Sequence, residues 1–141
     1  MVTKKSVSIW VLFGASIVAF FLGFTLTMQV GTAQQAAPTE NKNVTFTPLT
    51  AVDLGPEIPG LQLRLRMLTL EPGGVVAVHS HKDRPGAAYV LKGTVIEHRG
   101  DMAKEYGAGG NWAEGRDVTH WVENKGTSQA ALIAVDIFKQ P

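Results

Sequence analysis

The sequence predicts an all-β domain of the sandwich or closed-barrel class, and three observations support this prediction. From Val44 onward, no stretch shows the spacing of apolar residues that is typical of a helix. Apolar and polar residues alternate instead, most clearly over residues 61–67, and such alternation indicates a half-buried strand. Turn-forming residues interrupt the pattern at short intervals, as expected when many short strands pack into a sandwich or barrel.

The expected strands follow one another closely along the chain. Residues 61–70 form the first of them, and Glu71–Gly74 is expected to be a turn. The later strands are expected at residues 75–81, 87–91, 94–99, 118–122 and 129–138. Breaks are expected at Lys82–Pro85, Lys92-Gly93, Gly100-Asp101 and Gly107–Gly110. A domain of this length can bury a core of modest size.

Residues 1–33 have the features of an export segment. Lys4 and Lys5 precede a long apolar run, residues 7–26, and the small residues ending at Ala33 fit a signal-peptidase site. The run is longer than the apolar part of most signal peptides and approaches the ~20 residues that span a bilayer. A hydrophobic helix is therefore expected here, as a cleaved signal peptide or as an uncleaved membrane anchor.

Both alternatives place the rest of the chain outside the cytoplasm, in the cell envelope. The barrel is expected to be membrane-anchored, or to be periplasmic or secreted after cleavage near Ala33. Residues 34–43 are polar and contain Pro38, which predicts a flexible linker. The β-barrel domain is then expected to cover residues 44–141.

Composition excludes several classes of function. The chain of 141 residues has no cysteine, so disulfides, zinc–thiolate sites, iron–sulfur clusters and cysteine nucleophiles are excluded. The formal net charge is +1, and no block of like charges is present. The sequence therefore indicates no nucleic-acid partner.

Three of the four histidines are expected to point into the barrel. Strand alternation puts His79 and His81 on the same face as the small, apolar Val75 and Ala77, which indicates an inward direction. The two histidine backbones would then lie ~7 Å apart. His120 lies between two valines of the same alternation, and it is likewise expected to face inward.

A divalent metal would satisfy three imidazoles that meet inside a barrel, where an unpartnered polar group is costly. A single pair of histidines is equally compatible with ordinary core residues, so the third histidine is what favours a metal site. Imidazole suits several ions, and the expected cofactor is a divalent metal ion such as iron, manganese, zinc or nickel.

The histidines fall in a pattern that resembles the cupin family. The first cupin motif has a glycine, five residues, a His-x-His pair, a glutamate three or four residues later, and a second glycine. Here Gly73 precedes the segment His79-Ser80-His81 at that spacing, and Gly93 follows. In the second motif, Gly109, His120 and Asn124 fall in register. The turn of the second motif departs from the family pattern, because its proline and glycine are replaced by Gly115 and Asp117.

The resemblance extends over about residues 61–138. It implies a double-stranded β-helix, which is a jelly-roll-like barrel. It also implies that His79, His81 and His120 are metal ligands.

One further departure concerns the metal site, because the family's glutamate ligand falls at Gly86, which has no side chain. In one interpretation a three-histidine centre remains with more open positions, as in some dioxygenase-like cupins, and the protein is an oxidoreductase that acts on a small organic substrate. In the other, the protein is a non-catalytic module of the cell envelope that binds a small molecule or a metal. No catalytic residue is assigned. A small-molecule partner is expected in both cases, and a homodimer is compatible with a small barrel.

Other polar and aromatic residues are weaker candidates. Glu97 could replace the missing carboxylate if its strand points it inward, and His98, on the opposite face, could be an acid–base group or a rim residue. The remaining expectations are a packing role for Tyr89, packing or a pocket wall for Trp112 and Trp121, a solvated loop for Asp83 and Arg84, and a turn at Asn124.

Overall fold

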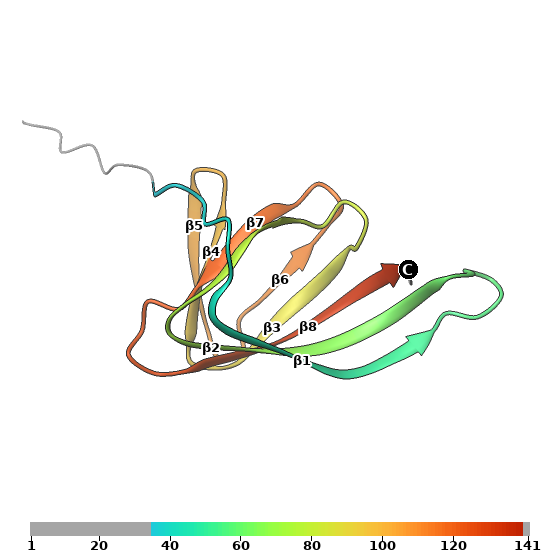
Figure 1. Ribbon diagram of the computed structural model, residues 1–141, viewed down its shortest axis with the longest axis horizontal. Helices are drawn as coiled ribbons and strands as arrows, with labels where there is room; N and C mark the ends of the chain where they lie inside the picture. The colour runs from blue at the N-terminus through green and yellow to red at the C-terminus, as the bar shows by residue number, and fades with distance from the viewer. Residues whose placement is uncertain (1–34, 140–141) are drawn as a thin grey trace, which may run out of the picture. The chain divides into compact units, whose positions relative to one another are not determined.

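The computed structural model describes residues 35–139, and this part of the chain contains eight strands and no helix (Figure 1). The strands are β1 (Lys42–Asp53), β2 (Leu61–Ser80), β3 (Gly86–Lys92), β4 (Thr94–Arg99), β5 (Met102–Gly107), β6 (Asn111–Glu114), β7 (Thr119–Glu123) and β8 (Ala130–Lys139). The predicted all-β class is confirmed. The predicted N-terminal helix and the cleavage site near Ala33 lie outside the described residues.

The strands form one sheet in the order β5-β4-β7-β2-β8-β3-β6, which curls into a nearly closed barrel (Figure 1). Strand β2 lies at the centre of this arrangement. Its first half, residues 61–70, pairs with both β1 and β8. Its second half, residues 75–80, pairs with β7. One long strand therefore belongs to both walls of the barrel.

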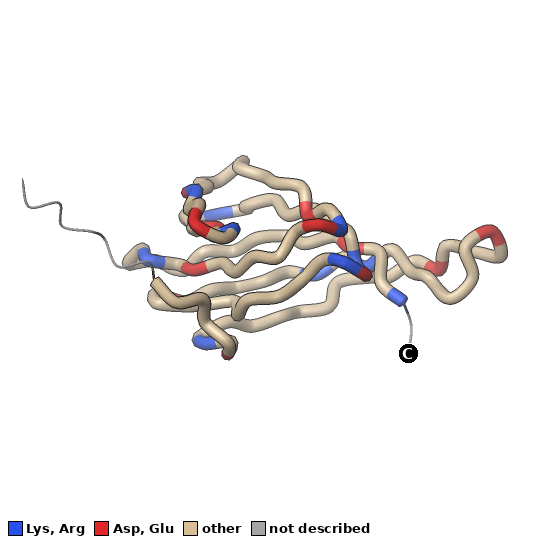
Figure 2. Tube along the Cα trace, turned by 90° about the horizontal axis from the view of Figure 1, so that it is seen from above, with Lys and Arg blue, Asp and Glu red and all other residues tan. Residues whose placement is uncertain are grey.

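The core fills the space between the walls with small and medium apolar side chains. Leu70, Val90 and Val95 are completely buried, and they come from three different strands. Trp112 on β6 packs at the edge of the same cluster, with its ring 4.7 Å from that of Tyr106. Figure 2 shows acidic and basic residues interspersed along the trace, without a long block of one sign.

The expected turn at Glu71–Gly74 is wrong, because β2 continues through these residues. The chain does not reverse here; instead, β2 exchanges one set of partners for the other, from Ala130 opposite Leu70 to Glu123 opposite Val75. Gly73 has a φ of 72°, a conformation that glycine adopts without strain. The glycine signal marks a bend inside a strand.

The inward direction of His79 arises differently from the expectation. A β-bulge lies between Val76 and His79, and it shifts the alternation by one residue. Val76, rather than Val75, is the core residue before the bulge. Residues of the predicted linker bind the backbone of β2 near this irregularity: the Ala77 amide donates to Asn41 Oδ1, and the next amide donates to the carbonyl of Pro38.

Three strands were not predicted from the sequence: β1, β5 and β6. Strand β6 has only four residues, too few for its alternation to stand out, yet it carries two buried side chains, Trp112 and Glu114. Among residues 35–139 there is no helix long and apolar enough to cross a membrane.

Candidate metal centre

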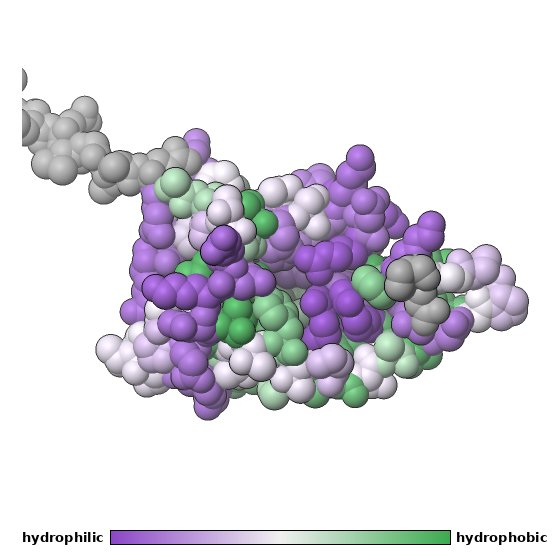
Figure 3. Space-filling model, in the orientation of Figure 1, coloured by the Kyte–Doolittle hydropathy of each residue, from purple (hydrophilic) through white to green (hydrophobic). Residues whose placement is uncertain are grey.

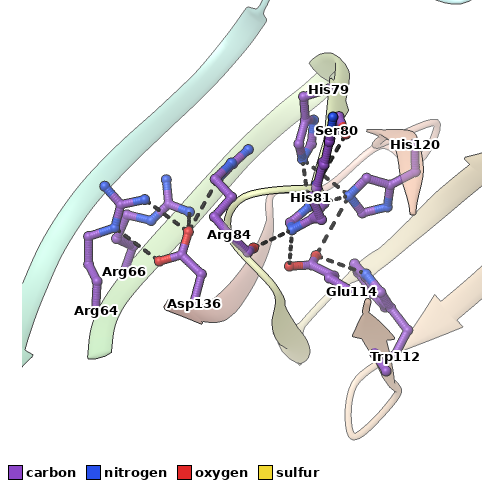
Figure 4. Close-up of polar contacts among 12 residues, drawn as sticks. Arg64, Arg66, His79, Ser80, His81, Arg84, Trp112, Glu114, His120 and Asp136 are labelled. Carbon is purple, nitrogen blue, oxygen red and sulfur yellow. Dashed lines mark hydrogen bonds and ion pairs between the residues drawn. The ribbon is translucent and has the colours of Figure 1, made fainter. Parts of the chain in front are cut away.

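The structure brings the three predicted histidines together. His79 and His120 lie directly opposite each other on β2 and β7, and His81 follows the end of β2. The three Nε2 atoms are 3.0 to 3.1 Å from one another (Figure 4). His81 and His120 are buried, with exposed fractions of 2% and 1%. Such a cluster could hold a metal ion.

The partners of the other ring nitrogens define the tautomers of the three rings. The Nδ1 atoms of His79 and His81 lie 2.8 and 3.1 Å from the carbonyl oxygens of Ala77 and Arg84, respectively. His120 Nδ1 lies 2.6 Å from Glu97 Oε1. Each partner is an acceptor, so each Nδ1 carries the proton. The three Nε2 atoms consequently face one another, an arrangement that suits a shared cation.

The spacing of the nitrogens fits one ion with three ligands. Nitrogens ~2.1 Å from an ion lie about 3.0 Å apart when they are at right angles, and about 3.4 Å apart at the tetrahedral angle. The observed separations of 3.0 to 3.1 Å match the right-angled set. The three histidines could therefore hold one ion together, and further positions on that ion would be open to other ligands.

Burial keeps two of the rings in the form that binds metals. It lowers the pKa of His79 and that of His81 to about 4, so both imidazoles are neutral at pH 7. Neutral imidazole is the ligand form, because a protonated ring has no lone pair to donate. Metal binding at neutral pH would thus require no deprotonation of these two side chains.

A buried carboxylate that the sequence prediction missed lies against the cluster. Glu114 Oε1 is 3.7 Å from His120 Nε2, and Oε2 is 3.5 Å from His81 Nδ1 (Figure 4). The indole nitrogen of Trp112 donates to Oε1 over 3.1 Å. Burial raises the pKa of this carboxyl group.

Glu114 lies opposite the position on β3 where the family pattern has its glutamate. Glu114 on β6 pairs directly with Gly86 on β3, and directly opposed residues project to the same face of a sheet. A Cβ at Gly86 would collide with the carbonyl oxygen of Val135 on β8. The close approach of β8 thus explains the glycine. The buried, alternating side chains of β6 were the signal that could have revealed Glu114, had that strand been recognised.

Glu97 points inward, as it would have to if it replaced the missing carboxylate ligand. It contacts His120 Nδ1, however, which is the nitrogen that faces away from the other two histidines. Burial favours a raised pKa for Glu97, yet hydrogen bonds from His120 and Arg99 lower it below its ordinary value. The ionised carboxylate therefore fixes the His120 ring. His98 lies on the other face, where it stacks on Trp121 and contacts Glu123 Oε1 over 2.7 Å.

The remaining candidates have varied roles. Tyr89 is 48% exposed, so the expected packing role is wrong. Trp112 lines a cavity beside the histidines. The amide of Asn124 donates to Leu70 and Ser128 carbonyls and fixes a turn, as expected. Arg84 is only partly exposed, and both its backbone and its side chain contact neighbouring residues.

A partly open cavity of about 450 Å³ adjoins the histidines. One part of its wall is apolar, with Leu68, Val76 and Trp112, and another is basic, with Arg66 and Arg84. Figure 3 shows this side of the molecule hollowed near its centre, with hydrophobic surface beside strongly hydrophilic surface. The volume lies in the range of pockets that bind small organic molecules.

Comparison with known proteins identifies the family. The model of the Cupin domain family matches residues 66–136, which include all three histidines and Glu114. The chain belongs to the cupin family. None of the curated proteins matches this cupin.

Solved structures confirm the cupin fold. A polyketide cyclase from Streptomyces resistomycificus is 20% identical, covers 74% of this chain and 72% of its own, and superposes with a TM-score of 0.58. A predicted oxalate decarboxylase from Thermotoga maritima is 19% identical, with 74% and 96% covered and a TM-score of 0.57. A cupin 2 conserved barrel domain protein from Salinispora arenicola is 17% identical, with 71% and 79% covered and a TM-score of 0.54. At these identities the likeness concerns the fold.

Proposed function

We propose that this cupin is a metal-dependent enzyme that binds a divalent ion through His79, His81 and His120. The observation that carries the proposal is the convergence of three Nε2 lone pairs, each defined by an acceptor at the opposite nitrogen of its ring. Without a cation, these lone pairs would repel one another in a buried site. A metal at the centre removes that cost for all three rings at once.

Glu114 is proposed as the fourth protein ligand. Its carboxylate contacts two of the three histidines, and it comes from the position directly opposite Gly86. A carboxylate among neutral imidazoles would balance part of the charge of a divalent ion. Trp112 holds one of its oxygens by a hydrogen bond, which limits the rotation of the side chain.

The cavity gives a small organic substrate access to this centre. When bound, a divalent ion supplies a Lewis-acid or oxygen-activating centre there. The protein's own side chains would bind the substrate and exclude water from one side through the apolar wall of Leu68, Val76 and Trp112. Among the reactions open to such a site, we propose a dioxygenase-like oxidation.

Export to the cell envelope is part of the proposal. It is supported by the sequence of residues 1–33, where Lys4 and Lys5 precede a long apolar run. The enzyme would then acquire its metal outside the cytoplasm. Whether the segment is cleaved decides between an anchored and a free enzyme.

Metal content is the first test. Full-length protein in detergent is reconstituted with iron, manganese, zinc or nickel salts, passed over a desalting column and measured by elemental analysis. We expect about one ion per chain, lost from the His79→Ala/His81→Ala variant. His98→Ala is the matched control, because His98 lies on the opposite face, and it should keep the ion.

Absence of metal from the reconstituted wild-type protein would overturn the proposed metal centre. Catalysis is tested separately by oxygen uptake and product analysis with the loaded protein. Metal binding without turnover of small organic molecules would leave the alternative function, a binding module of the cell envelope.

A further inference from the structure

A cluster of three arginines around one aspartate lies beside the proposed metal centre. Asp136 on β8 accepts two hydrogen bonds from Arg64, at 3.0 and 2.9 Å. Its Oδ2 atom also accepts from Arg66 at 3.0 Å and from Arg84 at 3.3 Å. Figure 4 shows Arg84 as the member of this cluster on the side of the histidines.

The cluster carries more positive charge than one carboxylate can balance. Each of the three guanidinium groups contributes one positive charge, whereas Asp136 contributes a single negative charge and is 1% exposed. Arg64 has a second partner, because its guanidinium lies 4.0 Å above the ring of Phe138. Arg66 and Arg84 line the cavity, and Asp136 is the one residue of the described part of the chain to which either guanidinium has an ion-pair contact within 4 Å.

Arg66 also has a buried donor that lacks a partner. Its Nε atom is the only buried side-chain nitrogen or oxygen of the described residues without a hydrogen bond. A buried donor without a partner is costly, and such sites are rare in folded proteins. Burial lowers the pKa of the Arg66 guanidinium, and Asp136 opposes this effect only in part. Arg66 therefore has donor capacity and positive charge that its contact with Asp136 does not use up.

The neighbouring carboxylate does not use this capacity. Glu114 lines the same cavity, but its ion-pair contacts are with His81 and His120 and its hydrogen bond is with Trp112. A ligand in the cavity could supply a further negative charge to Arg66 and Arg84. The planar fork of an arginine matches a carboxylate, because the two groups can form two parallel hydrogen bonds.

We propose that the cavity binds a small organic carboxylate, whose acid group is held by Arg66 and Arg84 while its carbon skeleton packs on the apolar wall. The apolar side chains Leu68, Val76 and Trp112 lie in the same cavity as the two arginines. This inference names the substrate class of the proposed enzyme and so rests on the proposed function. The carboxylate site itself, however, is formed by the protein alone and can be tested without metal.

The test uses metal-free, full-length protein in detergent, with benzoate as the probe and benzamide as its neutral counterpart of the same shape. Absence of metal excludes binding of the probe to an ion at the histidines. Isothermal titration calorimetry measures the affinity for wild-type protein and for Arg66→Met and Arg84→Met. In both variants Asp136 keeps its paired hydrogen bonds to Arg64, so the fold is expected to survive. Arg116→Met is the control, because Arg116 is exposed and binds the carbonyl of Lys82.

We expect benzoate to bind wild-type protein and the Arg116→Met control with the same affinity. Its affinity for Arg66→Met and for Arg84→Met should be at least ~10-fold lower. Benzamide should bind wild-type protein no more tightly than benzoate binds these two variants. Equal binding of benzoate and benzamide, equal affinity of all variants, or no benzoate binding to wild-type protein would each overturn the inference. Metal content of the same variants after reconstitution distinguishes the two proposals. If Arg66→Met still takes up metal but does not bind benzoate, the metal centre and the carboxylate site are both supported. If wild-type protein binds benzoate but takes up no metal, only the carboxylate site is supported.

Discussion

Gly86 on β3 and Glu114 on β6 lie directly opposite each other in the sheet. The glycine occupies the position where the cupin pattern has a glutamate, and the carboxylate of its cross-strand partner lies 3.7 Å from His120 Nε2. The two residues are 28 positions apart in the sequence, so the exchange is visible only once the strands are paired. Gly86 allows β8 to approach β3 closely, and Glu114 places a carboxylate on the same face of the sheet. The two residues form one pair in the β3–β6 ladder.

Removal of the Glu114 charge is predicted to weaken metal binding. In Glu114→Gln, we expect a decrease in affinity of at least about 10-fold, because a carboxylate ligand is replaced by a neutral amide of the same size. Competition with a chromophoric chelator measures this affinity. Glu123→Gln is the control, since Glu123 is equally buried but contacts His98 and Lys125. Equal affinities in the two variants would exclude Glu114 as a ligand.

A methyl group at Gly86 is predicted to destabilise the barrel. In Gly86→Ala, the added Cβ collides with the carbonyl oxygen of Val135, so that β3 and β8 must separate. We expect a loss of about 1–3 kcal/mol in the free energy of unfolding, measured with urea. Gly107→Ala provides the comparison, because nothing lies within 4 Å of the added atom there. A Gly86→Ala protein as stable as this control would show that the strands yield easily.

The contact of Glu97 with His120 is predicted to matter for metal affinity although Glu97 is not a ligand. The 2.6 Å contact fixes the tautomer and direction of the His120 ring. In Glu97→Gln, we expect metal affinity to fall by about 10- to 100-fold, the usual effect of changing a partner behind a ligand. The metal should remain bound at saturating concentration. Unchanged affinity would mean that the rest of the barrel holds the ring in place.

Asp136 is predicted to give the protein a pH-dependent part of its stability. Burial alone would raise the pKa of this carboxyl group, but the hydrogen bond from Arg64 and the charges of the other arginines lower it below its ordinary value of 3.8. Because the pKa is lower in the folded state, the ionised carboxylate stabilises the folded protein. This contribution to the free energy of unfolding is complete above the ordinary pKa and is lost as the pH falls through the folded-state pKa. Asp136→Asn should therefore cost about 1–3 kcal/mol at neutral pH, because it leaves three partly buried arginines without their shared counter-charge.

Urea unfolding of both proteins across the acidic range tests this pH dependence. The difference in unfolding free energy between wild type and Asp136→Asn is expected to be constant above about pH 5 and to shrink below the ordinary pKa. A difference that stays constant in acid, or grows, would contradict the assigned direction of the shift.

The sequence predicts much of this site because its clearest signals are local. Alternation on either side of His120, and the two-residue spacing of His79 and His81, correctly indicated three inward rings. The bulge after Val76 could not be predicted, since it depends on the pairing of β2 with β7. That His79 still faces inward shows that the ladder, not strict alternation, determines its direction.

The parts that were missed depend on partners distant in the sequence. Glu114 lies on a strand of four residues, and its importance follows only from its register with Gly86. Arg64 and Arg66 alternate with apolar residues, as in any strand that is exposed on one face. Their common partner Asp136 lies some 70 residues later in the chain, so the sequence pattern does not reveal it. Sequence pattern gives the direction of a side chain far more readily than the identity of its neighbour.

The position of β8 has a consequence for the order in which the molecule is assembled. This strand lies between β2 and β3, although both of them precede it by about 40 residues or more in the chain. Until residues 130–139 are available, β2 and β3 each expose an unpaired edge, and such edges promote aggregation. During synthesis, Arg64 and Arg66 have no contact with Asp136 until β8 has been made. Rapid local folding of the first half alone is therefore not expected to protect the nascent chain, and long-range closure by β8 is expected to control the folding rate.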